Sequence, residues 1–198
     1  MAADFTYDSV LPVYLKLDST LMPEDIVDGY METYRPEVWS KFRNDEFELE
    51  EKREETLRMM KDRIAAADAS ETFIIQSRFE FGDYDFKNEK FDFRPFADGL
   101  FFKLDHCCTD LPRKIKVSFL NADLVDGIQM AKDEAKAFLN SRKSSGGYVN
   151  RTVLAKLSIV MKEVPARGDL KSEIQSVEIY DNDGRTLITK IARESATN

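Results

Sequence analysis

The chain has 198 residues and a mass of 22.8 kDa, which fits one domain of ordinary size or one domain with an appendage. It contains 14 phenylalanines and 42% hydrophobic residues, so a packed core is expected and disorder over most of the chain is excluded. The net charge of −8 argues against nonspecific nucleic-acid binding by the whole molecule, and the sequence has no apolar run of the ~18 residues that a transmembrane helix needs.

The negative charge is confined to the first third of the chain. Residues 1–71 carry 18 acidic and 9 basic side chains, whereas residues 72–198 carry 19 acidic and 20 basic side chains. We therefore expect an acidic helical N-terminal region over 1–71 and a β-rich domain over 72–198 that together form one structural unit.

Helical spacing dominates the acidic region. Asp8 or Ser9 can cap a short first helix that carries the apolar residues of 10–14. A second helix is predicted over 23–34, where a proline followed by acidic residues favours a helix start, and Pro36 opens a third.

A long helix is predicted over 45–67. Its apolar stripe is sparse and consists of Phe47, Leu49, Leu57, Met60 and Ile64. The stripe is interrupted by a charged run whose acidic members are Glu50, Glu51, Glu54 and Glu55. The simpler interpretation of this run is a solvated face with ion pairs one turn apart. The sharper interpretation is a docking surface for a basic partner protein, because complementary potentials favour such a contact.

From residue 72 the apolar period changes from that of a helix to that of a strand. Nine of the 14 phenylalanines lie between 73 and 102, a density typical of the core of a sheet. Asp181–Gly184 is a strong hairpin signal, because an Asp-Gly pair suits a tight turn between antiparallel strands. Strands are predicted over 72–81, 100–104, 115–120, 149–164, 174–180 and 186–191.

Helical spacing returns once within the β-rich domain, over about 126–142. Asp123 or Asp126 can cap this inserted helix. The pattern as a whole predicts an α+β fold, in which N-terminal helices pack on an antiparallel β-sandwich or rolled sheet with one inserted helix.

The segment that follows the inserted helix is a candidate ligand-binding loop. Arg142, Lys143 and Arg151 supply cations, Asn150 supplies an amide, and two glycines between them allow backbone N–H groups to face an anion. The spacing is not that of a nucleotide-binding phosphate loop. The alternative is structural, because glycines end helices and cations at a helix C-terminus complement its dipole.

Other residues give weaker indications of chemistry. His106, Cys107 and Cys108 are adjacent, which excludes a disulfide framework and does not suit tetrahedral zinc, although His106 and Cys108 can share one face of a strand as a nucleophilic pair. Asp83 and Asp85 lie two residues apart, as a hydrolytic carboxylate pair requires, but turn acids are the simpler interpretation. No metal and no cofactor is predicted.

Several short segments together form a recognisable pattern. They are Asn44–Glu48, Phe79–Phe86, Ala135–Leu139 with Arg142, Val149–Arg151 and Val177–Tyr180. These segments resemble a family of mostly exported bacterial proteins that is described only as a domain of unknown function. The resemblance covers roughly residues 10–190 and implies a bacterial origin and a periplasmic or envelope location. It implies no catalytic residues, and a leader like that of exported members is not expected in this chain.

We therefore expect a non-catalytic bacterial envelope or secretion-associated protein that binds another macromolecule, with a protein rather than a nucleic acid as its partner. One alternative is a binding module for a small anionic or phosphate-bearing ligand at the Arg142–Arg151 loop. A second is a hydrolase that uses carboxylates or Cys108. The start Met1–Asp4 looks like a mature N-terminus with an added initiator, which suits a periplasmic location, with a cytoplasmic one as the alternative.

Overall fold

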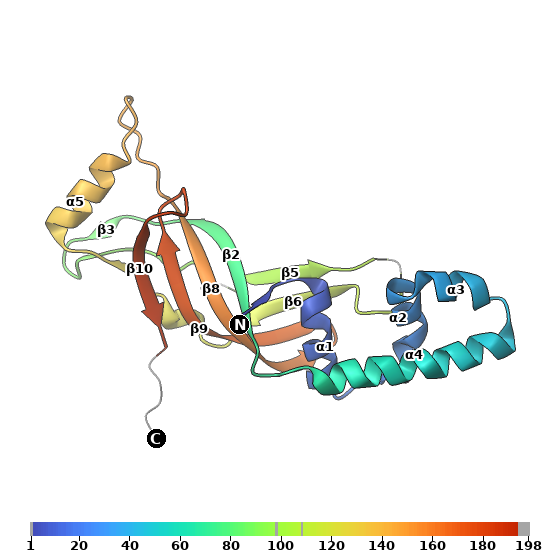
Figure 1. The fold of residues 1–198 in the computed structure, drawn as a ribbon. Coiled ribbons are helices and arrows are strands. Elements are labelled where there is room, and N and C mark those ends of the chain that lie inside the picture. The colour runs from blue at the N-terminus through green and yellow to red at the C-terminus, as the bar shows by residue number, and fades with distance from the viewer. Residues whose placement is uncertain (1, 98, 108, 194–198) are drawn as a thin grey trace, which may run out of the picture.

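A computed structural model describes residues 2–97, 99–107 and 109–193 (Figure 1). Helices fill most of the N-terminal third, and strands are the main regular structure of the remainder, so the predicted α+β class is confirmed. None of the described helices is long and apolar enough to cross a bilayer. The helices are α1 (Tyr7–Leu17), α2 (Val27–Tyr34), α3 (Pro36–Phe42), α4 (Glu46–Ala66) and α5 (Lys132–Ser141), with 3-10 turns η1 (Pro23–Ile26) and η2 (Ala122–Leu124).

The strands form two sheets. Sheet A has the order β1-β2-β8-β9-β6-β5, with β10 also paired to β9, and the small sheet B has the order β3-β4-β7. The pairs β1–β2 and β6–β9 are parallel and the others are antiparallel. The strands are β1 (Ala3–Asp4), β2 (Thr72–Glu80), β3 (Tyr84–Asp85), β4 (Lys90–Phe91), β5 (Phe101–Asp105), β6 (Lys114–Phe119), β7 (Ile128–Gln129), β8 (Thr152–Ala166), β9 (Asp169–Tyr180) and β10 (Leu187–Ala192).

Sheet A curls along the length of β8 and β9, so the rolled sheet is the predicted alternative that the structure bears out (Figure 1). The alternation expected from the sequence sets its two faces. Phe73 and Ile75 of β2 are buried, and Leu157 and Ile159 of the paired strand β8 are buried against the same core. The predicted hairpin between β9 and β10 is confirmed, with Gly184 at a positive φ of 74°.

Tyrosine hydroxyls tie α1 to the sheet. The fully buried Tyr14 accepts a hydrogen bond of 2.8 Å from the N–H of Gly168, in the turn between β8 and β9. Burial raises the pKa of Tyr14 to about 12. Tyr7 donates a hydrogen bond of 2.8 Å to the carbonyl of Pro112, which precedes β6. The helical layer is therefore attached to the sheet at two points on the same side.

Two predicted helix boundaries were wrong. Helix α1 begins at Tyr7 and its N-cap is Thr6, because Thr6 and Ser9 form a reciprocal capping box. The predicted cap Ser9 takes part in this box as the third residue of the helix and not as the N-cap. The inserted helix α5 spans only Lys132–Ser141, and its N-cap is Ala131 without a side-chain bond.

The residues just before α5 form a strand and not a helix. Ile128 and Gln129 form β7, which pairs with β4, and the Ile128 side chain is buried. Asp126 does not cap a helix but forms an ion pair of 2.6 Å with Lys90 of β4. Pairing across the chain therefore overrides the local helical spacing of this segment.

Asp18 holds the turn that follows α1. Its Oδ1 accepts the backbone N–H of Thr20 at 2.9 Å, the hydroxyl of Thr20 at 2.6 Å and the backbone N–H of Leu21 at 3.2 Å. Burial raises the pKa of this carboxyl, but the hydrogen bonds from Thr20, Tyr14 and Leu21 outweigh that effect, and the net pKa is lowered.

Replacing Asp18 with asparagine should cost roughly 1–2 kcal/mol of unfolding free energy at neutral pH, because bonds to a charged acceptor are stronger. Since the folded pKa is depressed, this contribution is present above the ordinary Asp pKa of about 4 and is lost as the pH falls through the folded pKa. Denaturant unfolding of wild type and Asp18→Asn checks this between about pH 7 and about pH 2. A difference in unfolding free energy between the two proteins that is the same at both pH values would contradict the prediction.

Candidate functional site

An acidic pocket of about 350 Å³ lies between α4, the η1–α2 segment and residue 110. Among the described residues that line it, Arg53 is the one cation, and Val27 and Leu57 are apolar. The acidic members of the lining are Glu24, Asp25, Asp28, Glu50, Glu54 and Asp110. Six carboxylates face one guanidinium, so the pocket has a strongly negative potential.

Local ion pairs neutralise only part of this charge. Arg53 donates two hydrogen bonds of 2.6 Å each to the carboxylate of Asp28, and its Nη1 lies 3.4 Å from Oε2 of Glu50. Glu24 pairs with Lys61 at 2.6 Å, a contact that lowers its pKa. No ion pair joins the three remaining carboxylates, those of Asp25, Glu54 and Asp110, to another described residue.

The structure divides the four glutamates that the sequence singled out. Glu50 and Glu54, one turn apart, both line the acidic pocket. Glu51 is exposed but does not line it. Glu55 pairs with Lys52 at 3.1 Å and with Arg35 at 2.7 Å, and these two cations hold its pKa below the usual range. Glu55 therefore fastens α4 to the α2–α3 junction.

An exposed aromatic group continues this surface. Phe47 is 84% exposed although the sequence placed it in the apolar stripe of α4 with Leu49, which is buried. Residues two apart on a helix point to different faces, so the spacing of Phe47 and Leu49 already indicates that only one of them can be buried. Phe47 instead shares a face with Glu50 and Glu54, at positions i, i+3 and i+7. The neighbouring helix α3 has no buried residue and projects beyond the sheet (Figure 1).

In the predicted ligand loop, Arg142 is bound internally. Its guanidinium donates to the carbonyls of Asn150 at 3.0 Å and Thr152 at 2.9 Å, and to the carboxylate of Asp181. It also lies 4.4 Å from the ring centroid of Phe138, and the side chain is 6% exposed. Burial lowers its pKa, and Asp181 opposes that shift. Arg142 therefore joins α5 to β8 and to the β9–β10 turn.

The other three predicted ligand residues also have partners within the chain. Arg151 bonds the carbonyl of Gly82 and pairs with Asp83 at 3.0 Å. The ammonium of Lys143 donates to the side-chain oxygen of Asn140 at 2.9 Å. The side-chain oxygen of Asn150 accepts the backbone N–H of Thr152 at 2.9 Å. The guanidinium groups of Arg142 and Arg151 both lie over the ring of Phe81, at 5.6 and 5.5 Å from its centroid.

The residues considered for hydrolysis are dispersed. The His106 ring stacks on Tyr7 with centroids 4.7 Å apart, Cys107 is exposed, and Cys108 lies outside the described residues. Asp85 accepts the backbone N–H groups of Lys87 and Asn88. The hydrogen bonds from Asn88 are the largest cause of its lowered pKa. In the described part of the chain, no group of three His, Cys, Asp or Glu side chains is placed to hold a metal ion.

The sequence of this region decides the family. Residues 23–141, more than half of the chain, match the family described as "Domain of unknown function (DUF4852)". The chain belongs to this family. The predicted membership of a family of unknown function is thus confirmed. The matched segment of this DUF4852 protein contains every residue that lines the acidic pocket, and it excludes β8, β9 and β10. No curated protein and no solved structure shows significant similarity to the chain.

Proposed function

We propose that this DUF4852 protein is a non-catalytic binding protein whose acidic pocket receives a lysine or arginine side chain of a partner protein. The observation that carries the proposal is the surplus of carboxylates around one concave site, three of them without an ion pair to a described residue. Such carboxylates repel each other, and a cation inserted among them relieves that repulsion.

The face of α4 suits a protein better than a free amine. The acidic pocket, with a volume of about 350 Å³, has room for a side chain, whereas a protein interface extends over ~800 Å² of the surface of each partner. Phe47 extends the site along the same helical face, and exposed aromatic residues beside charged groups are typical anchors of interfaces. A basic segment that places a cation beside Glu50 and Glu54 and an apolar residue against Phe47 would satisfy both features.

We also propose a bacterial envelope or secretion-associated setting for this binding. The support is the resemblance to mostly exported bacterial proteins. Fractionation of the native cells, with antibody detection of the protein, tests this location. Recovery with the cytoplasmic markers would contradict it.

A hexa-arginine peptide is the probe that tests the acidic pocket. The double variant Glu50→Lys, Glu54→Lys should weaken its binding at least about tenfold, because two like charges then face the peptide. The variant Glu51→Lys, Asp62→Lys is the matched control, since it makes the same change in net charge on exposed residues of α4 that do not line the pocket. Fluorescence anisotropy with labelled peptide at fixed salt gives the two dissociation constants. Equal weakening in both variants would leave only general electrostatic attraction and would refute the site.

A further inference from the structure

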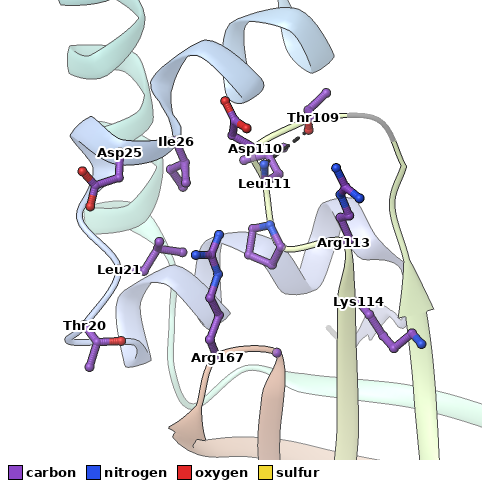
Figure 2. A pocket seen from close by; sticks show the side chains of 12 residues that line it. Thr20, Leu21, Asp25, Ile26, Thr109, Asp110, Leu111, Arg113, Lys114 and Arg167 are labelled. Atoms are coloured by element: carbon purple, nitrogen blue, oxygen red, sulfur yellow. Dashed lines mark hydrogen bonds between the residues drawn. The ribbon is translucent and has the colours of Figure 1, made fainter.

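A second and larger pocket, the junction pocket, lies where the helical layer meets the sheet (Figure 2). Its volume is about 800 Å³, within the range of small-molecule sites. Three chain segments form its walls: residues 20–26 on the helical side, residues 109–114 before and at the start of β6, and residues 167–168 in the β8–β9 turn. It adjoins the acidic pocket, because Asp25 and Asp110 line both.

The sheet side of the junction pocket carries cations. Arg113, Lys114 and Arg167 line it, and no ion pair or side-chain hydrogen bond joins them to another described residue. This sets them apart from Arg142 and Arg151, whose guanidinium groups bond carbonyls and carboxylates of their own chain. Neighbouring cations that have no ion-pair partner repel each other, and an anionic ligand relieves that repulsion.

The two arginines are directed to the same side of the pocket. Figure 2 shows the side chains of Arg113 and Arg167 extending from the sheet toward the helical layer, whereas Lys114 points away from it. Asp25 lies on the helical side and Asp110 in the segment before β6, and the carboxylates of both point away from the arginines. A ligand between the two guanidinium groups would therefore meet donors and not these acids.

The turn that carries Arg167 is held in place. Gly168 has a φ of 83°, and a Cβ added to it would lie 2.8 Å from the carbonyl oxygen of Lys114. Its N–H is bound by the Tyr14 hydroxyl at 2.8 Å, and its carbonyl accepts the N–H of Lys116 at 2.8 Å. The turn is thus fixed to α1 and to β6, which sets the backbone separation of Arg167 and Arg113 before any ligand binds.

We propose that the junction pocket binds a small, multiply charged anion that bears phosphate or carboxylate groups, held between Arg113 and Arg167. Guanidinium groups present planar pairs of donors that match both kinds of oxyanion. A nucleic acid is disfavoured by the net charge of −8 on the whole chain, whereas a small anion meets only the local field of the pocket.

Calorimetry with pyrophosphate and with citrate, at constant ionic strength, tests the proposal on the full chain. We expect saturable binding of at least one of them, and the pair separates phosphate from carboxylate preference. Arg113→Gln and Arg167→Gln should each weaken it about tenfold or more, in line with charge-assisted hydrogen bonds. Arg185→Gln is the matched control, because Arg185 is exposed, has no ion pair to a described residue and does not line the pocket. It lies in the β9–β10 turn, at the end of β9 opposite to the turn that carries Arg167.

Binding that survives both arginine substitutions, or that falls equally in Arg185→Gln, would overturn the proposal, as would the absence of heat with both anions. Circular dichroism establishes that the arginine variants are folded. The Glu50→Lys, Glu54→Lys variant should keep its affinity for the anion, because neither glutamate lines the junction pocket. The anion site and the proposed protein-binding site can therefore fail separately.

Discussion

Substitution of Arg142 with methionine is expected to lower the free energy of unfolding by roughly 2–4 kcal/mol. Methionine fills part of the volume beside Phe138, but it cannot replace the bonds to the carbonyls of Asn150 and Thr152 or to Asp181. The side chain is 6% exposed, so water cannot readily take over these bonds. The end of α5 would then lose its attachment to the start of β8 and to the β9–β10 turn.

Urea unfolding with tryptophan fluorescence measures this loss. Lys143→Met is the control, because Lys143 is an exposed neighbour and its removal should change stability by no more than ~0.5 kcal/mol. A loss at Arg142 no larger than at Lys143 would mean that the guanidinium is not a structural tie. That result would favour the interpretation of this loop as an anion site over the structural interpretation.

Substitution of Gly29 with alanine is expected to destabilise the protein by about 1–3 kcal/mol, although the same change in an open helix normally stabilises it. Gly29 lies in α2, and a Cβ there would approach the backbone nitrogens of Asp110 and Leu111 at 2.6 and 3.0 Å. Backbone atoms cannot rotate aside, so the 109–112 segment has to move. Because Asp110 lines both pockets, the affinities for hexa-arginine and for the small anion should fall together.

Thermal unfolding checks the sign of this effect. Gly146→Ala is the matched control, since its added Cβ would have only a side-chain oxygen at 3.9 Å nearby. That variant should be as stable as wild type or slightly more stable, because alanine restricts the unfolded chain. A Gly29→Ala protein with an unchanged or raised melting temperature would show that α2 and residue 110 are not in tight contact.

Local patterns predicted most of the elements. The alternation of 72–81 gave β2, the capped charged run gave α4, and Asp181–Gly184 gave the last hairpin, because each depends on neighbours in sequence. The segment before α5 failed because its structure depends on Phe91 of β4, which lies 37 residues before Ile128 in the chain. A single-sequence pattern carries no information about such a partner.

The candidate sites divide in the same way. Glu50 and Glu54 were found because they belong to one charged run, whereas Asp110 joins them only through the packing of α2 against the β5–β6 connection. Arg113 and Arg167 gave no local signal. They come together because β6 and β9 pair in parallel, which places the start of β6 beside the β8–β9 turn.

The central position of β8 and β9 affects folding during synthesis. β2 pairs with β8, and β6 pairs with β9, so neither pair can form until residues 152–180 have been synthesised. On the ribosome, the helices and the first strands therefore emerge long before their sheet can close, and unpaired strand edges and apolar side chains stay accessible to chaperones. The matched segment 23–141 stops short of both strands. It marks a stretch of related sequence and not a piece that can complete this sheet.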